Sequence, residues 1–285
     1  MSSPSRAMDT TPQLTGLLQL PALALMLLVA APAPAAANEE EAALATQLAN
    51  PIANLISVPF QGNYDGNIGP EEDGEKLFVN FQPVIPFTLN QDWNLISRTI
   101  LPITWQDSVF PGAGTQFGFG NTRQSLFFSP STPSHGILWG AGPIFLVPTH
   151  TEELLGLDTW GVGPTAVGLW QGKGWTVGIL ANQIWSVAGD QDEEINAAYL
   201  QPFISYTTPN AWTFAVNSES TYDWDRDTWS VPINVVVSKL VKVGGKVPVS
   251  IFGGVRYWVD APEDIGPEGW GARFGFTLLL PRNRS

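Results

Sequence analysis

Apolar and polar residues alternate at a period of two along much of the chain. Among residues 270–280 every even-numbered position is apolar, from Trp270 to Leu280, whereas Arg273 and Thr277 stand at odd-numbered positions. Successive side chains of a β-strand point to opposite faces of the sheet, so this period predicts a strand with one apolar and one polar face. Two other segments show the same alternation clearly: residues 77–89 and 229–238.

Twelve segments with strand character follow one another between residues 55 and 280. Their lengths fit the roughly 9–11 residues that a tilted strand needs to cross a bilayer. An even number of crossings also returns the chain to the side on which it started, as in bacterial outer-membrane barrels. The segments are 55–64, 77–89, 93–105, 115–128, 138–148, 160–170, 175–185, 197–207, 212–222, 229–240, 247–258 and 270–280.

The connections between these segments alternate between acidic stretches and short turns. In an up-and-down arrangement every second connection lies on the same side. The alternation therefore predicts an all-β fold, a transmembrane antiparallel up-and-down β-barrel of twelve strands over residues 51–281, with acidic connections outward and short turns in the periplasm. The acidic connections contain residues 71–75, Asp107, 152–158, 190–194, 223–227 and 260–268, and the short turns contain 90–92, 129–136, 171–174, 207–211 and 242–247.

The N-terminus predicts export. Arg6 precedes an apolar run over residues 17–30, and small residues follow up to Ala37. This is the pattern of a secretory signal peptide, so residues 1–37 are expected to be removed. Residues 38–50 are rich in Ala and Glu and predict a short helix, either a periplasmic tail or a plug in the barrel.

Composition agrees with a protein in the outer membrane. Charged residues make up 14% of the chain, against about 25% in typical soluble proteins, while aromatic residues reach 11% with 12 Trp. Many of these Trp lie near strand ends, which predicts two aromatic girdles at the membrane boundaries. The alternative is a soluble β-sandwich with Trp in its core. A net charge of −13 argues against nucleic acid as a partner.

Prolines interrupt the predicted strands. Proline lacks the N–H that a ladder hydrogen bond needs, so each one is expected at a bulge or a local break. A sharper alternative is that kinked strands open a side path toward lipid. The prolines are Pro59, Pro83, Pro86, Pro102, Pro143, Pro164, Pro202 and Pro232.

Ten stretches carry a family resemblance across nearly all of the chain beyond residue 37. They are LANPIANLISVPFQGNYDGNIGPEEDGE (from Leu48), VNFQPVIPF (Val79), DWNLISRTILPI (Asp92), QSLFFSP (Gln124), WGAGPIFLVPT (Trp139), WGVGPTAV (Trp160), NQIWSVAGD (Asn182), YLQPFISYTT (Tyr199), STYDWDRDTWSVPIN (Ser220) and GPEGWGARFGFTLLLP (Gly266). In these stretches the chain resembles a bacterial outer-membrane family named for the meta-pathway of phenol degradation, often labelled "transporter" and misnamed neuromedin U. The resemblance implies an outer-membrane channel or transporter and favours hydrophobic or aromatic solutes, without assigning any functional residue.

Charged residues at inward positions are the candidate selectivity site. Arg256 and Arg273 alternate with apolar neighbours on the last two strands. Glu219 stands at an inward-facing position of the predicted strand 212–222, at a comparable depth. Arg98 and Arg123 are also mid-strand. Charged rings inside a pore set ion and solute selectivity. The alternative is a salt-bridge network that fills a narrow lumen. A barrel of about 8 strands is filled by side chains and one of 16 or more leaves a water channel, so twelve strands allow either.

Other chemistry is thinly supported. The run DWDRD offers Asp223, Asp225 and Asp227 at the spacing that begins an EF-hand loop, but Thr228 stands where Gly is needed. Divalent cations are instead expected to bridge acidic loops loosely. His150 suggests an outer-membrane hydrolase, although no GxSxG motif occurs.

We therefore expect no catalytic residue, no cofactor and no dedicated metal site. The expected function is passive passage of small solutes across the bacterial outer membrane, with outer-membrane lipid, solute and loosely bound divalent cations as partners. The alternatives are a structural or surface-binding barrel that transports nothing and, third, the hydrolase.

Overall fold

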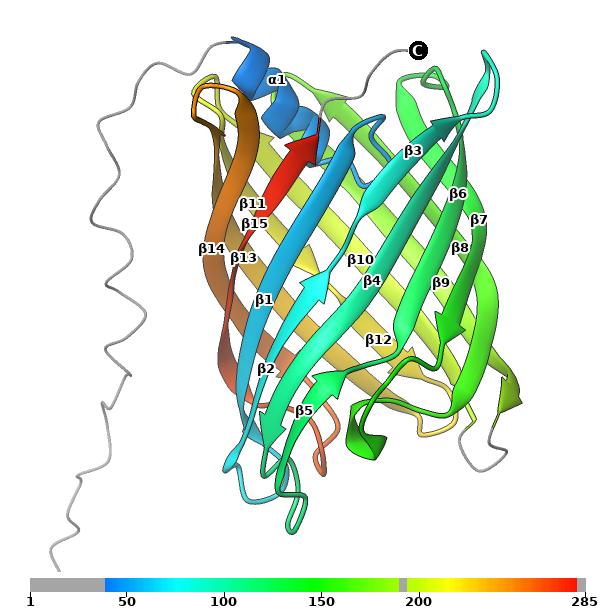
Figure 1. Cartoon of the computed structure of the whole chain (residues 1–285), viewed down its shortest axis with the longest axis vertical. Helices are drawn as coiled ribbons and strands as arrows, with labels where there is room; N and C mark the ends of the chain where they lie inside the picture. The colour runs from blue at the N-terminus through cyan, green and yellow to red at the C-terminus, as the bar shows by residue number, and fades with distance from the viewer. Residues whose placement is uncertain (1–38, 190–193, 281–285) are drawn as a thin grey trace, which may run out of the picture. The chain divides into compact units, whose positions relative to one another are not determined.

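The computed structural model describes residues 39–189 and 194–280; the predicted signal peptide, residues 1–37, lies outside the described residues. Within the described ranges the chain forms one α-helix, one 3-10 helix and fifteen strands (Figure 1). The helices are α1 (Glu39–Leu48) and η1 (Glu153–Leu155). The strands are β1 (Ile56–Ile68), β2 (Gly74–Phe81), β3 (Val84–Thr88), β4 (Trp93–Asp107), β5 (Thr115–Phe119), β6 (Thr122–Pro130), β7 (Ile137–Val147), β8 (Thr159–Gly172), β9 (Trp175–Gly189), β10 (Asn196–Thr207), β11 (Trp212–Ser218), β12 (Ser220–Asp223), β13 (Thr228–Val243), β14 (Val247–Asp260) and β15 (Gly269–Leu280).

The strands form one closed antiparallel barrel. Each crossing of the wall pairs with the next one in the sequence, and β1 pairs with β15 from Ile56↔Leu280 to Tyr64↔Ala272. Three crossings are interrupted, between β2 and β3, between β5 and β6, and between β11 and β12, so the fifteen strands of the described residues make twelve crossings. The prediction of a twelve-stranded up-and-down barrel is confirmed. The β-sandwich alternative is wrong.

Prolines mark the interruptions of the ladder. Pro143 and Pro164 face each other in the β7–β8 ladder. On its other side Pro143 falls in a gap of the β6–β7 pairing, and Pro164 falls in a gap of the β8–β9 pairing. Neither proline can donate a ladder hydrogen bond, and each lies at a break in one of its two ladders, as predicted. The remaining strand prolines also lie beside a gap or an unpaired edge: Pro59, Pro83, Pro86, Pro102, Pro202 and Pro232.

The outward face is apolar and carries exposed Trp near the strand ends. On β15 the exposed residues Trp270, Phe274, Phe276 and Leu280 all stand at even-numbered positions. Such a face suits lipid, and the indole rings near strand ends suit its boundary. One Trp near a strand end does not belong to a girdle, because Trp258 Nε1 donates a hydrogen bond to Asp65 Oδ1 inside the barrel at 2.8 Å.

One side of the barrel interior is filled by apolar side chains. The larger cluster brings together buried residues of β3, β4, β6, β8 and β9 with Ile52, which follows α1. A second cluster joins β7 and β9 through Ile144, Leu146 and Ile184. The interior is therefore apolar on this side. The larger cluster consists of Ile52, Val84, Ile96, Phe127, Val167, Leu169 and Leu180.

Helix α1 packs against one end of the barrel, at the top of Figure 1, which we call the helix end. Ala45 is buried against Leu240 and Leu279. Lys242 Nζ forms an ion pair with Glu40 Oε2 at 2.8 Å, and Gln171 Nε2 donates to the Thr46 carbonyl at 2.8 Å. The described acidic connections all lie at the opposite end, the loop end. Among the described residues no helix is long and apolar enough to cross a membrane.

Phe127 provides a test of the filled side of the interior. Its side chain is 0% exposed and faces inward, whereas the neighbouring Phe128 is 43% exposed on the outward face. Phe127→Ala should lower the free energy of unfolding by about 3–5 kcal/mol, because it leaves a cavity. Phe128→Ala should cost less than half of that, because lipid or detergent fills the space. Denaturant unfolding of the protein in detergent measures both. Equal losses would contradict the packed interior.

Candidate functional site

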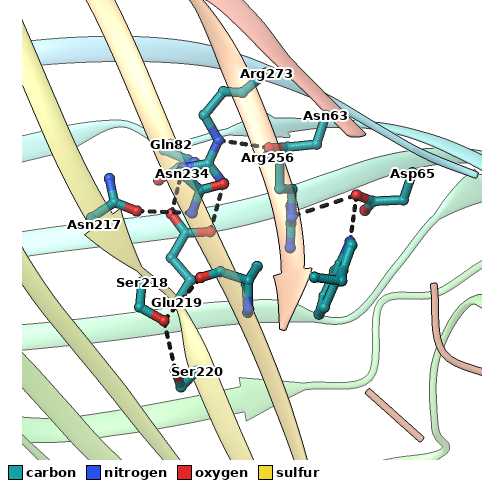
Figure 2. A network of polar contacts seen from close by, with 12 residues as sticks. Asn63, Asp65, Gln82, Asn217, Ser218, Glu219, Ser220, Asn234, Arg256 and Arg273 are labelled. Atoms are coloured by element: carbon teal, nitrogen blue, oxygen red, sulfur yellow. Dashed lines mark hydrogen bonds and ion pairs between the residues drawn. The ribbon is translucent and has the colours of Figure 1, made fainter. Parts of the chain in front are cut away.

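Arg273 and Glu219 form a bidentate ion pair across the lumen. Arg273 Nη1 donates to Glu219 Oε1 at 2.8 Å and Nη2 donates to Oε2 at 2.7 Å, while Nε donates to Asn63 Oδ1 at 2.8 Å (Figure 2). Arg273 is 3% exposed. A guanidinium that meets a carboxylate in this parallel geometry makes one of the stronger polar contacts in proteins. The pair connects β15 to the break between β11 and β12.

The backbone at Glu219 is released from the β-ladder by a proline. The pairs Ser218↔Ile233 and Thr221↔Ser230 keep one register on either side of the break, which places Pro232 opposite Glu219. Since Pro232 has no N–H, the ladder cannot continue there. Ser218 Oγ donates to the Pro232 carbonyl at 2.9 Å and lies 2.7 Å from Ser220 Oγ. The Ser218 hydroxyl thus bonds a backbone carbonyl at the break in the ladder.

Arg256 and Asp65 form a second buried pair. Arg256 Nε lies 3.4 Å from Asp65 Oδ1, and both residues are nearly inaccessible to solvent. The guanidinium carbon of Arg256 lies 4.5 Å from the ring centroid of Trp258 and 5.8 Å from that of Phe78. A guanidinium over an aromatic face is attracted by the ring electrons. Arg256 is thus held by a carboxylate and two rings.

Three further cations face the lumen. Lys76 interacts electrostatically with Asp65 and Arg256. Arg98 Nη2 donates to Gln82 Oε1 at 3.2 Å. Arg123 is exposed to solvent within the barrel and lies in electrostatic reach of Arg98 and Glu219. We call these seven side chains the lumen network: the cations Lys76, Arg98, Arg123, Arg256 and Arg273, and the carboxylates Asp65 and Glu219.

The structure brings all five predicted lumen residues into this network. Arg256 and Arg273 lie at similar heights on neighbouring strands, as the alternation predicts, because Gly254 pairs with Arg273 and Gly271 with Arg256. Their role in selectivity stays a prediction. Sequence reasoning missed Asp65, Lys76 and Trp258. The signal was available, because these residues have the same parity as inward neighbours on their strands: Asn63 for Asp65, Gln82 for Lys76 and Arg256 for Trp258.

A cavity of about 290 Å³ lies between the helix end and the Arg273–Glu219 pair. Residues of α1 and the segment after it, including Leu48 and Asn50, form one wall. Barrel side chains form the others. Most of these carry amides or hydroxyls, and two are guanidinium groups, from Arg98 and Arg273. The barrel side chains that line it include Gln82, Val84, Arg98, Phe203 and Phe252.

Both ring nitrogens of His150 lie beside other polar side chains of the described residues. Its Nδ1 lies 2.9 Å from Asn121 Oδ1, and its Nε2 lies 3.4 Å from Asp158 Oδ1. In a hydrolase of this kind the free ring nitrogen takes a proton from a nucleophilic hydroxyl. Here Nε2 faces a carboxylate instead, so a serine or threonine nucleophile would have to reach it by displacing Asp158.

The DWDRD loop closes on itself. Asp223 Oδ1 accepts hydrogen bonds from the backbone N–H groups of Asp225 and Arg226, both at 3.0 Å, and Tyr222 Oη donates to Asp227. Within residues 39–189 and 194–280, no three His, Cys, Asp or Glu side chains gather as metal ligands would. Loose bridging of acidic loops by divalent cations stays a prediction.

Solved structures similar to this chain are bacterial outer-membrane proteins. An outer membrane channel from Pseudomonas putida F1 has a TM-score of 0.61 and 14% identical residues, and the similarity covers 79% of this chain and 94% of that one. Outer membrane phospholipase A from Escherichia coli has a TM-score of 0.50 and 12% identical residues, covering 78% and 90%. At these identities the similarity shows the fold alone, that of a bacterial outer-membrane β-barrel. No family model and no curated protein matches the chain.

The Arg273–Glu219 pair can be tested by a double-mutant cycle. Glu219→Gln or Arg273→Met alone should lower the free energy of unfolding by about 3–5 kcal/mol, because each leaves the partner's charge buried and unpaired. The double variant should recover part of that loss. Arg226→Gln is the control, since Arg226 pairs with Asp223 at an exposed site and should change stability little. Additive losses in the double variant would contradict a coupled pair.

Proposed function

We propose that this protein is an outer-membrane channel for the passive passage of small solutes. The observation that carries the proposal is that the lumen holds a cation exposed to solvent, Arg123, beside a wall of apolar side chains. An unpaired charge away from water is costly, so an exposed cation inside the barrel favours a lumen that holds water. The similarity to the channel from Pseudomonas putida F1 adds support for the same fold.

We place the loop end outside the cell and the helix end in the periplasm, as the alternation of acidic connections and short turns predicts. The family resemblance is consistent with this placement and with small hydrophobic or aromatic solutes. In this arrangement α1 and the segment after it act as a plug at the periplasmic mouth, because Ala45 and Ile52 are buried in the barrel end.

A barrel that transports nothing is the second candidate. The observation in its favour is that Arg273 and Arg256 are each held by an ion pair, as in a salt-bridge network that fills a lumen. A hydrolase is the least favoured, because His150 Nε2 faces Asp158. The two barrel hypotheses differ in whether the inserted protein conducts.

Single-channel recording in planar bilayers tests the proposal. The protein without its signal peptide should give stepwise currents that favour anions, because the lumen network holds five cations and two carboxylates. Arg123→Gln should reduce that preference, since Arg123 is the network's exposed cation. The matched control Arg226→Gln, in an exposed loop, should leave it unchanged. Silence from protein shown to be inserted would overturn the open channel and favour the filled barrel.

The plug can be tested through its docking contacts. Lys242→Ala combined with Gln171→Ala removes the ion pair to Glu40 and the hydrogen bond to Thr46. The expected result is a larger or more frequently open conductance, because α1 would leave the mouth more often. Lys246→Ala, an exposed lysine in the same turn as Lys242, is the control. Identical conductance in the two variants would show that α1 does not limit the current.

A further inference from the structure

We propose that the cavity between the helix end and the Arg273–Glu219 pair binds small carboxylates that carry an apolar body, with Arg98 as the partner of the carboxylate. The inference rests on the proposed channel in one respect, that solutes must reach the lumen. It names the class of solute that the lumen would retain on its way through.

Of the two cations that line the cavity, Arg273 is paired with a carboxylate and Arg98 forms its hydrogen bond with a neutral amide. No aspartate or glutamate is among the described residues that line it. Of its two guanidinium groups, that of Arg273 is occupied by Glu219 and Asn63 through Nη1, Nη2 and Nε. Arg98 has one hydrogen bond among the described residues, from Nη2 to the neutral amide of Gln82. A guanidinium has five N–H donors, so Arg98 keeps donors for an incoming anion.

The geometry of a guanidinium suits a carboxylate. Two parallel N–H groups match two carboxylate oxygens, and a charged hydrogen bond is stronger than a neutral one. Gln82 fixes one end of the Arg98 group, which reduces the freedom that a ligand must restrict. Arg123, in electrostatic reach of Arg98, adds positive potential on the side toward the loop end.

An apolar surface begins directly beside Arg98. Val84 is its cross-strand partner on β3 and belongs to the larger apolar cluster, against which Phe203 packs. Val84, Phe203 and Phe252 all line the cavity. A ligand with its carboxylate on Arg98 would therefore lay its body on Val84 and Phe203. Burial of that body adds binding energy in proportion to its apolar area.

The size of the cavity limits the ligand. Its volume of about 290 Å³ is at the lower end of the roughly 300–1,000 Å³ of ligand pockets. A single ring or a short alkyl chain with one carboxylate fits that space. A dicarboxylate would place its second charge against amides and apolar groups, because Arg273 is already paired with Glu219.

Isothermal titration of the refolded protein in a zwitterionic detergent tests the inference. The probes are benzoate and hexanoate, with benzamide and hexanamide as neutral controls of the same shape. Both carboxylates should bind, and the amides should bind at least tenfold more weakly. Arg98→Gln should raise the Kd of the carboxylates about 10-fold or more, since it removes the charged donors that the carboxylate binds.

Two variants keep the test interpretable. Arg98→Lys keeps the charge but loses the paired donors, so it should give an intermediate Kd and serves if Arg98→Gln does not fold. Arg226→Gln removes a cation from an exposed loop and should leave binding unchanged. Amides that bind as tightly as carboxylates, or equal effects of Arg98→Gln and Arg226→Gln, would overturn the inference.

The same preparation separates this inference from the channel. Vesicles that contain the protein are tested for the passage of a neutral solute such as glycerol. Passage without carboxylate binding would refute the binding site and leave the channel standing. Carboxylate binding without passage would refute the open channel and leave the binding site standing.

Discussion

Every backbone N–H and C=O in the wall of this protein must find a partner within the wall, because lipid offers none. That constraint explains the closure of β1 on β15, which leaves no open edge. It also explains why the prolines are tolerated only where one of the two neighbouring ladders is already interrupted. The break at Glu219 shows the principle at its clearest: where Pro232 removes a ladder bond, serine hydroxyls satisfy part of the deficit, and the side chain at the break faces the lumen.

The interior divides into two unlike halves. The side formed largely by β4 and β6–β9 is filled by aliphatic and aromatic residues around Phe127, and the side formed by β1, β2 and β11–β15 carries most of the lumen network. Arg98 and Arg123 lie on the apolar side, as strand neighbours of Val84 and Leu146. A lumen of this kind can contact an amphipathic molecule on both of its faces at once, which a uniformly polar pore cannot do.

Much of the fold could be predicted from the sequence, because a barrel wall between lipid and lumen imposes its period of two on nearly every strand. The parity of Arg256 and Arg273 placed them inside correctly. The same parity placed Trp258 inside, but its position near a strand end suggested a girdle, and the structure shows that parity was the better guide. Which cation meets which carboxylate could not be predicted, because Glu219 and Arg273 face each other across the lumen from strands that do not pair. The docking of α1 was equally out of reach, since a ten-residue helix carries no signal of its partner.

The hydrogen bond from Arg273 to Asn63 joins residues 210 positions apart in the sequence, from the last strand to the first. It can form only when the barrel has closed. Interactions that are absent until the end of folding slow unfolding more than they speed folding. The contact between Arg273 and Asn63 therefore stabilises the seam between the first and last strands. It should lengthen the lifetime of the closed barrel more than it raises the rate at which the barrel assembles.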